Sequence, residues 1–305
     1  MLIFDYFLLP NKRSYWLYLI SAAFISAGYF LLKKERINLQ KTKAYWWSAE
    51  AKLDYAYFIV VFMIKAYLLM PFIISAQSIT LWVYQFMLTH FGYYRIQNLS
   101  SYNIMLLYTA TTFILSDLSR YALHRLMHKV SFLWHFHKVH HSASKLNPIT
   151  FYRVHPVENL LFGFRYSIVI GVVTGIFVYF FGANLKILDV LGANILLFCF
   201  NLIGGNLRHS HIMLAYPKWL EKWLISPAQH QLHHHISYTN KNYGGYLAIW
   251  DRLFKSLEFS QITKNLPKEQ QLNFGLGESN ATKYQSILKL LLRPFVDLYQ
   301  QIFKP

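Results

Sequence analysis

Fourteen histidines occur in this 305-residue sequence, and most of them fall into short, repeated clusters. The pattern His-x-x-His-His occurs twice and a His-x-x-x-His pair precedes its first copy, which together supply His124, His128, His137, His140, His141, His230, His233 and His234. Neutral imidazole is a common nitrogen ligand for iron and zinc. The spacing therefore predicts metal binding, and eight imidazoles are enough to hold two ions and leave open coordination positions.

Helices are the elements expected to position these rings, because residues three and four apart share one helical face. The first pair belongs to a stripe that runs through Asp117, Tyr121, His124 and His128. Before the second triplet stands Ser226-Pro227, a good N-cap followed by proline at the first helical position. A helix is therefore predicted to begin there and to present the second triplet in its first turns.

Acidic residues are scarce near the clusters, which narrows the chemistry. No Glu-x-x-His pair of soluble di-iron bundles, no His-Glu-x-x-His signature and no Gly-x-Ser-x-Gly turn occurs. The single cysteine, Cys199, excludes an intrachain disulfide, a four-cysteine zinc site and an iron–sulfur cluster built by one chain. Any metal must be held mainly by histidine.

The composition indicates an integral membrane protein. Apolar residues make up 55% of the chain and charged residues 14%, whereas soluble domains carry about 25% charged residues. The net charge of +17 arises from Lys and Arg placed between and beside apolar runs. That placement favours attraction to anionic lipid over nucleic acid.

Apolar runs at residues 15–32, 55–76, 102–116, 160–181 and 185–204 predict an all-α, polytopic membrane bundle of about four to five spans. The last two runs are separated by three residues and are expected to form a transmembrane hairpin over 160–204. Basic residues concentrate in segments 33–54 and 117–158 and after residue 204. The positive-inside rule then places the histidine-rich cap on the cytoplasmic side.

Three segments of one integrated domain are expected. Residues 1–116 form N-terminal transmembrane helices, 117–259 form the histidine-box catalytic region with its hairpin, and 260–305 form a polar loop and an amphipathic helix. The apolar stripe of that last helix lies within residues 284–303, with Pro294 expected to bend it. It suits either the membrane interface or the protein's own cytosolic domain.

Several motifs between residues 117 and 254 resemble the fatty acid hydroxylase/sterol desaturase superfamily. Beyond the histidine clusters, they are Arg153-Val-His155-Pro156-Val-Glu158, Asn206-Leu-Arg-His209-Ser-His211, Ser226-Pro-Ala-Gln-His230 and Asn242-Tyr-Gly-Gly-Tyr-Leu-Ala-Ile-Trp250-Asp251-Arg252-Leu-Phe254. The motifs cover nearly half of the chain and are specific in combination. The resemblance implies a membrane-bound oxygenase with two non-haem iron ions that uses O2 and two electrons to hydroxylate or desaturate a sterol or fatty acyl chain.

The same resemblance carries metal-ligand and catalytic roles onto the eight clustered histidines and a ligand role onto His209. His155 and His211 are further candidate ligands, whereas His90, His135 and His235 are expected to lie outside the ligand set. Asp117 is expected either to hold a ligand imidazole in one tautomer or to cap the membrane end of its helix.

The electrons must come from outside, because the chain shows no His-Pro-Gly-Gly haem motif, no Gly-x-Gly-x-x-Gly nucleotide site and no flavin signal. A separate cytochrome, ferredoxin or reductase is the expected partner, with a lipid from the bilayer as substrate. Two other functions compete with this one. The first is a zinc-dependent membrane lipid hydrolase or isomerase without redox chemistry, and the second is a metal transporter, whose ligands should lie inside the spans.

Overall fold

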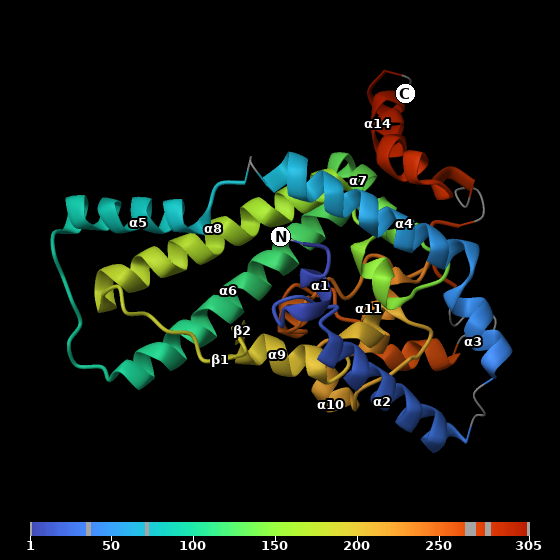
Figure 1. The fold of residues 1–305 in the computed structure, drawn as a ribbon, viewed down its shortest axis with the longest axis horizontal. Helices are drawn as coiled ribbons and strands as arrows, with labels where there is room; N and C mark the ends of the chain where they lie inside the picture. The colour runs from blue at the N-terminus through green and yellow to red at the C-terminus, as the bar shows by residue number, and fades with distance from the viewer. Residues whose placement is uncertain (1, 35–37, 71–72, 266–272, 278–281, 304–305) are drawn as a thin grey trace.

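The computed structural model describes residues 2–34, 38–70, 73–265, 273–277 and 282–303, and it is mostly helical (Figure 1). Its N-terminal half contains α1 (Asp5–Leu8), α2 (Trp16–Lys33), α3 (Leu39–Trp46), α4 (Ala49–Ile64), the π-helix η1 (Lys65–Leu69), α5 (Ala76–Phe91), α6 (Ser101–Lys129) and α7 (Ser131–His141). The C-terminal half contains η3 (Pro148–Tyr152), α8 (Pro156–Phe181), β1 (Asp189–Val190), β2 (Ala193–Asn194), α9 (Ile195–Leu202), η4 (Gly205–His209), α10 (Lys218–Glu221), α11 (Pro227–His234), α12 (Ile249–Leu253), η5 (Ser260–Asn265), η7 (Thr282–Tyr284) and α14 (Ile287–Phe303).

Helices α5, α6 and α8 form an elongated arm at one end of the molecule, and most of the other helices gather at the other end (Figure 1). Helix α8 approaches α5 closely through Gly171 and Gly175. A Cβ atom at either glycine would lie 2.6 Å from the Cβ of Ile79 or of Val83 on α5. Small residues of this kind let helix backbones pack closely where the hydrophobic effect between helices is weak.

The helical hairpin predicted over residues 160–204 is wrong in its second half. Helix α8 covers the first run, but the chain then forms the short antiparallel β1–β2 pair, and α9 has only 8 residues. Eight helical residues rise about 12 Å, far less than the ~30 Å hydrocarbon core. Gly192, with φ +83°, turns the chain between the two strands. The sequence alone shows only a continuous apolar run at this place.

Two helices among the described residues, α2 and α8, are long and apolar enough to cross a membrane. Helix α2 leaves Phe24 74% and Leu32 88% exposed, as a lipid-facing helix would. The other predicted spans differ from this pattern, because the run at 55–76 overlaps α4, which has 16 residues and is followed directly by η1, and α6 continues past its apolar part into Asp117 and the first histidine pair. The span count of four to five stays a prediction.

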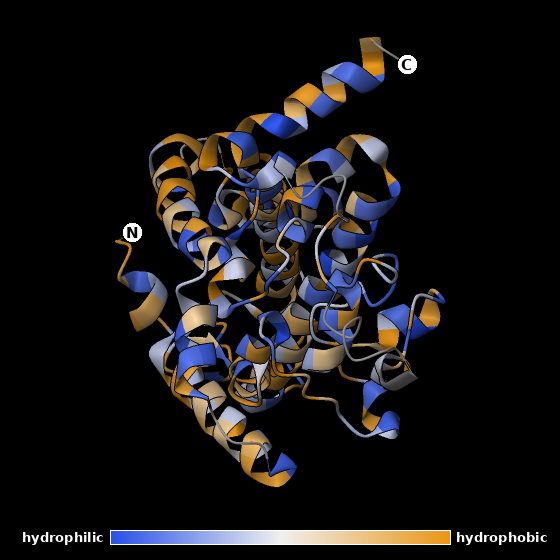
Figure 2. Cartoon of the chain, turned by 90° about the vertical axis from the view of Figure 1, so that its right-hand side faces the viewer, coloured by the Kyte–Doolittle hydropathy of each residue, from blue (hydrophilic) through white to orange (hydrophobic). Residues whose placement is uncertain are grey.

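The C-terminal helix α14 packs on α7 and α4 through one face. Leu290 and Pro294 are buried there, and Asp297 forms an ion pair with Lys138 at 2.6 Å. The predicted apolar stripe lies largely on other faces, with Leu288 65% exposed. The helix therefore contacts α7 and α4 and also presents apolar side chains outward, and its C-terminal end projects from the molecule (Figure 2).

A buried ion pair joins helix α4 to the segment between η3 and α8. Arg153 and Asp54 are each 1% exposed, and Arg153 Nε donates to Asp54 Oδ1 at 2.5 Å. The other oxygen of Asp54 accepts from Asn147 and Thr150, and Arg153 Nη2 contacts Glu50 at 2.7 Å. Helix α4 is thereby joined to η3 and to the segment that leads into α8.

Removing one member of this network should destabilise the fold strongly. Arg153→Met leaves the Asp54 carboxylate buried without its partner, and the expected loss is about 3–5 kcal/mol of unfolding free energy. Asp54→Asn in the same chain should recover part of that loss, because it removes the orphaned charge. Thermal unfolding of the purified protein in detergent measures both changes.

The matched control for this prediction is Lys241→Met, which breaks a partly exposed ion pair of 3.8 Å with Glu258. It should cost less than about 1 kcal/mol. Equal effects of Arg153→Met and Lys241→Met would contradict the importance of the buried pair.

Candidate metal centre

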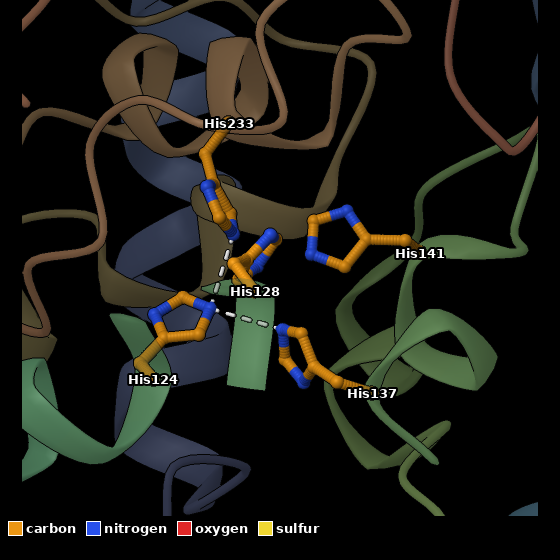
Figure 3. Close-up of side chains that lie close together, drawn as sticks. All are labelled: His124, His128, His137, His141 and His233. Carbon is orange, nitrogen blue, oxygen red and sulfur yellow. Dashed lines mark hydrogen bonds between the residues drawn. The ribbon is translucent and has the colours of Figure 1, made fainter. Parts of the chain in front are cut away.

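The structure brings nine histidines into two adjoining clusters. The first, cluster A, contains His124, His128, His137, His141 and His233, and the second, cluster B, contains His140, His209, His230 and His234. Within each cluster one ligand-type atom from every ring lies within 4.8 Å of all the others. Figure 3 shows the five rings of cluster A pointing toward one another. Eight of the nine side chains are buried and His128 is half-buried.

Each His-x-x-His-His triplet contributes to both clusters. On α7, His137 and His141 point into cluster A and His140 into cluster B. On α11 the assignment is reversed, because His230 and His234 enter cluster B and His233 enters cluster A. The ring of His141 stacks on that of His234 at 4.5 Å between centroids. The repeated motif thus lets two helices share two neighbouring sites.

Local sequence signals set these helices in place. Ser226 caps α11 by accepting from the backbone N–H of Gln229, whose side chain accepts from the Ser226 N–H, and this capping box confirms the predicted start of the helix. Between α6 and α7 only Val130 is extended, with φ −96° and ψ 114°. That single break turns the chain so that His128 and His137 face each other, with ring centroids 4.7 Å apart.

Hydrogen bonds fix the tautomers of two rings in cluster A. His124 Nδ1 donates to the Tyr243 carbonyl oxygen at 2.8 Å, and His233 Nδ1 donates to the Lys241 carbonyl oxygen at 2.7 Å. A neutral ring that donates from Nδ1 carries a bare lone pair on Nε2. Yet the Nε2 atoms of His124 and His233 lie 3.1 Å apart. Two lone pairs cannot form a hydrogen bond with each other, so this spacing favours a cation bound between the two rings.

The nitrogen spacing fits such a cation. His124 Nε2 also lies 3.1 Å from His137 Nε2, and in cluster B His209 Nε2 lies 3.1–3.3 Å from the Nε2 atoms of His140, His230 and His234. Two nitrogens bound at about 2.1 Å to one ion, at 90–109° to each other, stand about 3.0–3.4 Å apart. Buried ring nitrogens without a hydrogen-bond partner occur on His128 and His141. Both clusters therefore suit a metal ion.

Glu158 ends one of the family motifs, but the sequence alone assigned it no role at the site. It lies in the first turn of α8, is 3% exposed, and accepts from His137 Nδ1 at 2.9 Å. Its other oxygen is buried without a partner. A carboxylate in this position orients a ligand imidazole and raises its basicity. The sequence did contain a signal for this residue, because Glu158 is the sole acid between Asp117 and Asp189, a stretch that also holds the first histidine triplet.

Asp117 contacts no histidine ring, so neither role expected for it describes its contacts. Its carboxylate accepts from the backbone N–H groups of Tyr246 and Leu247 at 2.9 Å each and from the Trp250 indole at 3.0 Å. Asp251 likewise accepts from the N–H of Tyr243 at 2.8 Å. The two acids hold the loop whose carbonyl oxygens orient His124 and His233.

The two further candidate ligands lie outside both clusters. Both ring nitrogens of His155 are engaged, since Nε2 lies 3.0 Å from the Leu291 carbonyl oxygen and Nδ1 accepts from the Val157 N–H. His211 packs against the ring of Tyr45 at 4.3 Å. Neither is retained as a proposed ligand. The rings expected outside the ligand set are also absent from the clusters, namely His90, His135 and His235.

Burial keeps these imidazoles uncharged. It is the largest cause of a lowered pKa at all nine cluster residues, and neighbouring histidines lower most of these values further. The pKa values of His137 and His140 fall to about 3. Neutral rings are the form that binds metal, so the site is ready for ions at any physiological pH.

Comparison with known proteins gives one family and several relatives. The profile of the family described as fatty acid hydroxylase matches residues 109–256, just under half of the chain. An ornithine lipid hydroxylase of Rhizobium tropici is 29% identical over 60% of this chain and 48% of its own length. A Delta(7)-sterol 5(6)-desaturase of Gibberella zeae is 28% identical over 47% of this chain and 39% of its own length. An alkylglycerol monooxygenase of Danio rerio is 30% identical over 45% of this chain and 28% of its own length. The chain thus spans less than half the length of each of these relatives, and no solved structure matches it significantly.

Glu158→Gln should weaken metal retention while leaving the fold intact. The amide can still accept from His137, but it lacks the charge that makes the imidazole more basic, and the expected loss of metal affinity is about 10–100-fold. Metal transfer to a chelator, followed by metal analysis of the protein, measures the effect. Glu258→Gln, at a partly exposed acid away from the clusters, is the control; the same retention in both variants would contradict the role of Glu158.

Acid should destabilise the metal-free protein over a defined range. Because the folded-state pKa values are lowered from 6.5, the unfolded chain takes up protons below pH 6.5 that the folded chain refuses. Stability should be independent of these groups above pH 6.5 and should fall toward pH 3, by about 1.4 kcal/mol per pH unit for each histidine. Unfolding measured from pH 8 to pH 4 tests this expectation. A flat profile below pH 6.5 would show that the rings are not buried as described.

Proposed function

Because the chain belongs to the fatty acid hydroxylase/sterol desaturase superfamily, we propose that it is a membrane-bound, non-haem di-iron oxidoreductase that hydroxylates or desaturates a lipid. The observation that carries this proposal is the pair of adjoining, buried, all-histidine clusters. Two iron ions would supply the redox chemistry with O2 that oxidation of an unactivated C–H bond requires. A sterol or a fatty acyl chain is the proposed substrate class.

The chain's own residues would serve this chemistry in three ways. The nine clustered histidines would hold the ions: His124, His128, His137, His141 and His233 at one, and His140, His209, His230 and His234 at the other. Glu158 and the carbonyl oxygens of Tyr243 and Lys241 would keep the ligand rings oriented. Burial of the clusters would exclude water, which protects a strong oxidant from side reactions.

The surroundings of the site support a membrane enzyme. Helices α2 and α8 have the length and composition of spans, and all nine clustered histidines lie outside them. A lipid from the bilayer would supply the substrate, and a separate cytochrome, ferredoxin or reductase would supply the electrons. The excess of Lys and Arg in the segments around the clusters supports a metal site on the cytoplasmic side. A transporter fits less well, because its ligands should lie within the spans.

The zinc-dependent alternative has one observation in its favour, which is that nitrogen-only ligand sets also suit zinc. Metal analysis separates the two functions. Protein purified rapidly from cells grown with trace metals should contain about two iron ions per chain and consume O2 in the presence of a lipid substrate and a reductant. Zinc at both positions, with a lipid hydrolysed and no O2 consumed, would establish the alternative.

A comparison of cellular lipids tests the proposed activity directly. Cells that express the wild-type chain should contain a lipid that differs by one added oxygen atom or two lost hydrogens, and cells that express His140→Ala should lack it. His90→Ala is the matched control, because His90 is exposed and lies outside both clusters. Mass spectrometry of total lipid extracts reads the difference. Identical lipids in wild-type and His140→Ala cells would refute the activity in that host.

A further inference from the structure

Three arginines from distant parts of the chain lie near one another, and two of them, Arg13 and Arg208, lie near His209 of cluster B. The guanidinium carbons of Arg120 and Arg208 lie 5.6 Å and 5.4 Å from the centre of the Tyr246 ring. Arg13 donates to the carbonyl oxygen of Gly205, at the start of the short helix η4 that carries Arg208. The N-terminal segment, α6 and η4 thus bring three positive charges to one place.

This group has very little negative charge around it. Among the described residues, no carboxylate oxygen lies within 4.0 Å of a guanidinium nitrogen of Arg13, Arg120 or Arg208. The nearest acid in electrostatic terms is Asp117, and its carboxylate already accepts three hydrogen bonds from Tyr246, Leu247 and Trp250. The arginine group therefore carries excess positive charge.

Two of the three guanidinium groups also have unused donors. The Nε atoms of Arg13 and Arg208 are buried and have no hydrogen-bond partner. Water cannot satisfy the Arg208 donor, because that residue is only 3% exposed. Burial, followed by the charges of Arg208 and Arg120, lowers the pKa of Arg13 to about 9. Buried charges in proteins are normally paired, because an unpaired one costs several kcal/mol. A complementary anion would remove that cost.

We propose that Arg13, Arg120 and Arg208 form an oxyanion-binding site that takes the phosphate or carboxylate of an anionic lipid. Guanidinium groups bind these two anions through paired, parallel N–H donors, and the buried Nε atoms supply the donors still available. The shared chemistry is a tetrahedral or planar oxyanion, which a lipid headgroup or a free anion can provide. The position of the site in the fold decides between a lipid headgroup and a free anion.

The position favours a lipid headgroup. Arg13 precedes the candidate span α2 by three residues, which is the level at which headgroups lie. The Arg13 guanidinium also stacks 4.4 Å from the Phe151 ring, and that ring lies 5.9 Å from the ring of His209 in cluster B. An anion held here would lie close to the metal centre. Its assignment to the lipid substrate rests on the proposed function, whereas the anion site itself does not.

A purely structural role is the competing explanation. Arg208 donates to the carbonyl oxygens of Gly245 and Ile225, and Arg13 to that of Gly205, so the arginines also brace the loops around the site. Bracing uses the terminal nitrogens and explains their contacts. It leaves the Nε donors and the excess charge without a function, and it predicts no dependence of stability on added anions.

Binding by the full-length, metal-loaded protein in neutral detergent tests the proposal. Dioleoylphosphatidate, oleate, inorganic phosphate and dioleoylglycerol are the probes, with thermal unfolding and native mass spectrometry as readouts. Phosphatidate or oleate should stabilise the wild type and form an adduct, whereas dioleoylglycerol, which lacks the anion, should not. Arg208→Gln should weaken this binding roughly 10- to 100-fold, since it removes charge-assisted hydrogen bonds.

Arg95→Gln is the matched control, because it removes the same charge from an exposed arginine. Should Arg208→Gln fail to fold, Arg13→Gln and Arg208→Lys replace it, with metal content as the check on the site. Arg208-dependent binding of inorganic phosphate alone would assign the site to a free anion. Absence of binding by every anion, or equal binding by Arg208→Gln, Arg13→Gln and Arg95→Gln, would overturn the proposal. These binding measurements need no enzymatic turnover. The anion site can therefore be confirmed or refuted even if the proposed lipid oxidation is not observed.

Discussion

The contact between two bare nitrogen lone pairs, on His124 and His233, is the constraint on which the rest of the structure depends. Two backbone carbonyl oxygens fix the tautomers that create this contact, and burial keeps the rings from taking up protons that would relieve it. Packing alone gives no reason to hold two acceptors 3.1 Å apart. A cation bound where the nitrogens converge would relieve this repulsion, and its binding free energy would then contribute to the stability of the fold.

The architecture around the clusters serves to hold rings from distant segments at this spacing. Helix α6 brings two of them from the arm, α7 and α11 each divide a triplet between the clusters, and η4 adds His209. The loop after α11 contributes carbonyl oxygens, and two buried carboxylates, Asp117 and Asp251, hold that loop by its N–H groups. The acids of this region thus act on the backbone, apart from Glu158, which acts on a ring.

Much of this site is readable from sequence, and the limits have physical causes. The spacing of the clusters pointed to eight of the nine clustered histidines and to the start of α11, because ligand type and capping are local properties, whereas His209 was expected only from the family resemblance. The spacing could not divide the rings between two clusters, since His137, His140 and His141 differ by small rotations about one helix and only the neighbouring helices decide where each points. The prediction of a second hairpin helix at 185–204 was wrong for a related reason, because an apolar run does not reveal whether it forms helix, strand or turn.

Positive charge dominates the region around the two clusters. The histidine clusters would receive cations, yet the acids available to offset them are few, and Glu158 is the sole carboxylate in contact with a cluster ring among the described residues. Arg13 and Arg208 add further positive charge near cluster B, and Arg120 adds more near His124 of cluster A. A centre of this kind attracts electrons and anions together. The same imbalance that would favour reduction of the metal ions would therefore draw the anionic end of a lipid toward the site, so that one electrostatic feature would serve both electron transfer and substrate placement.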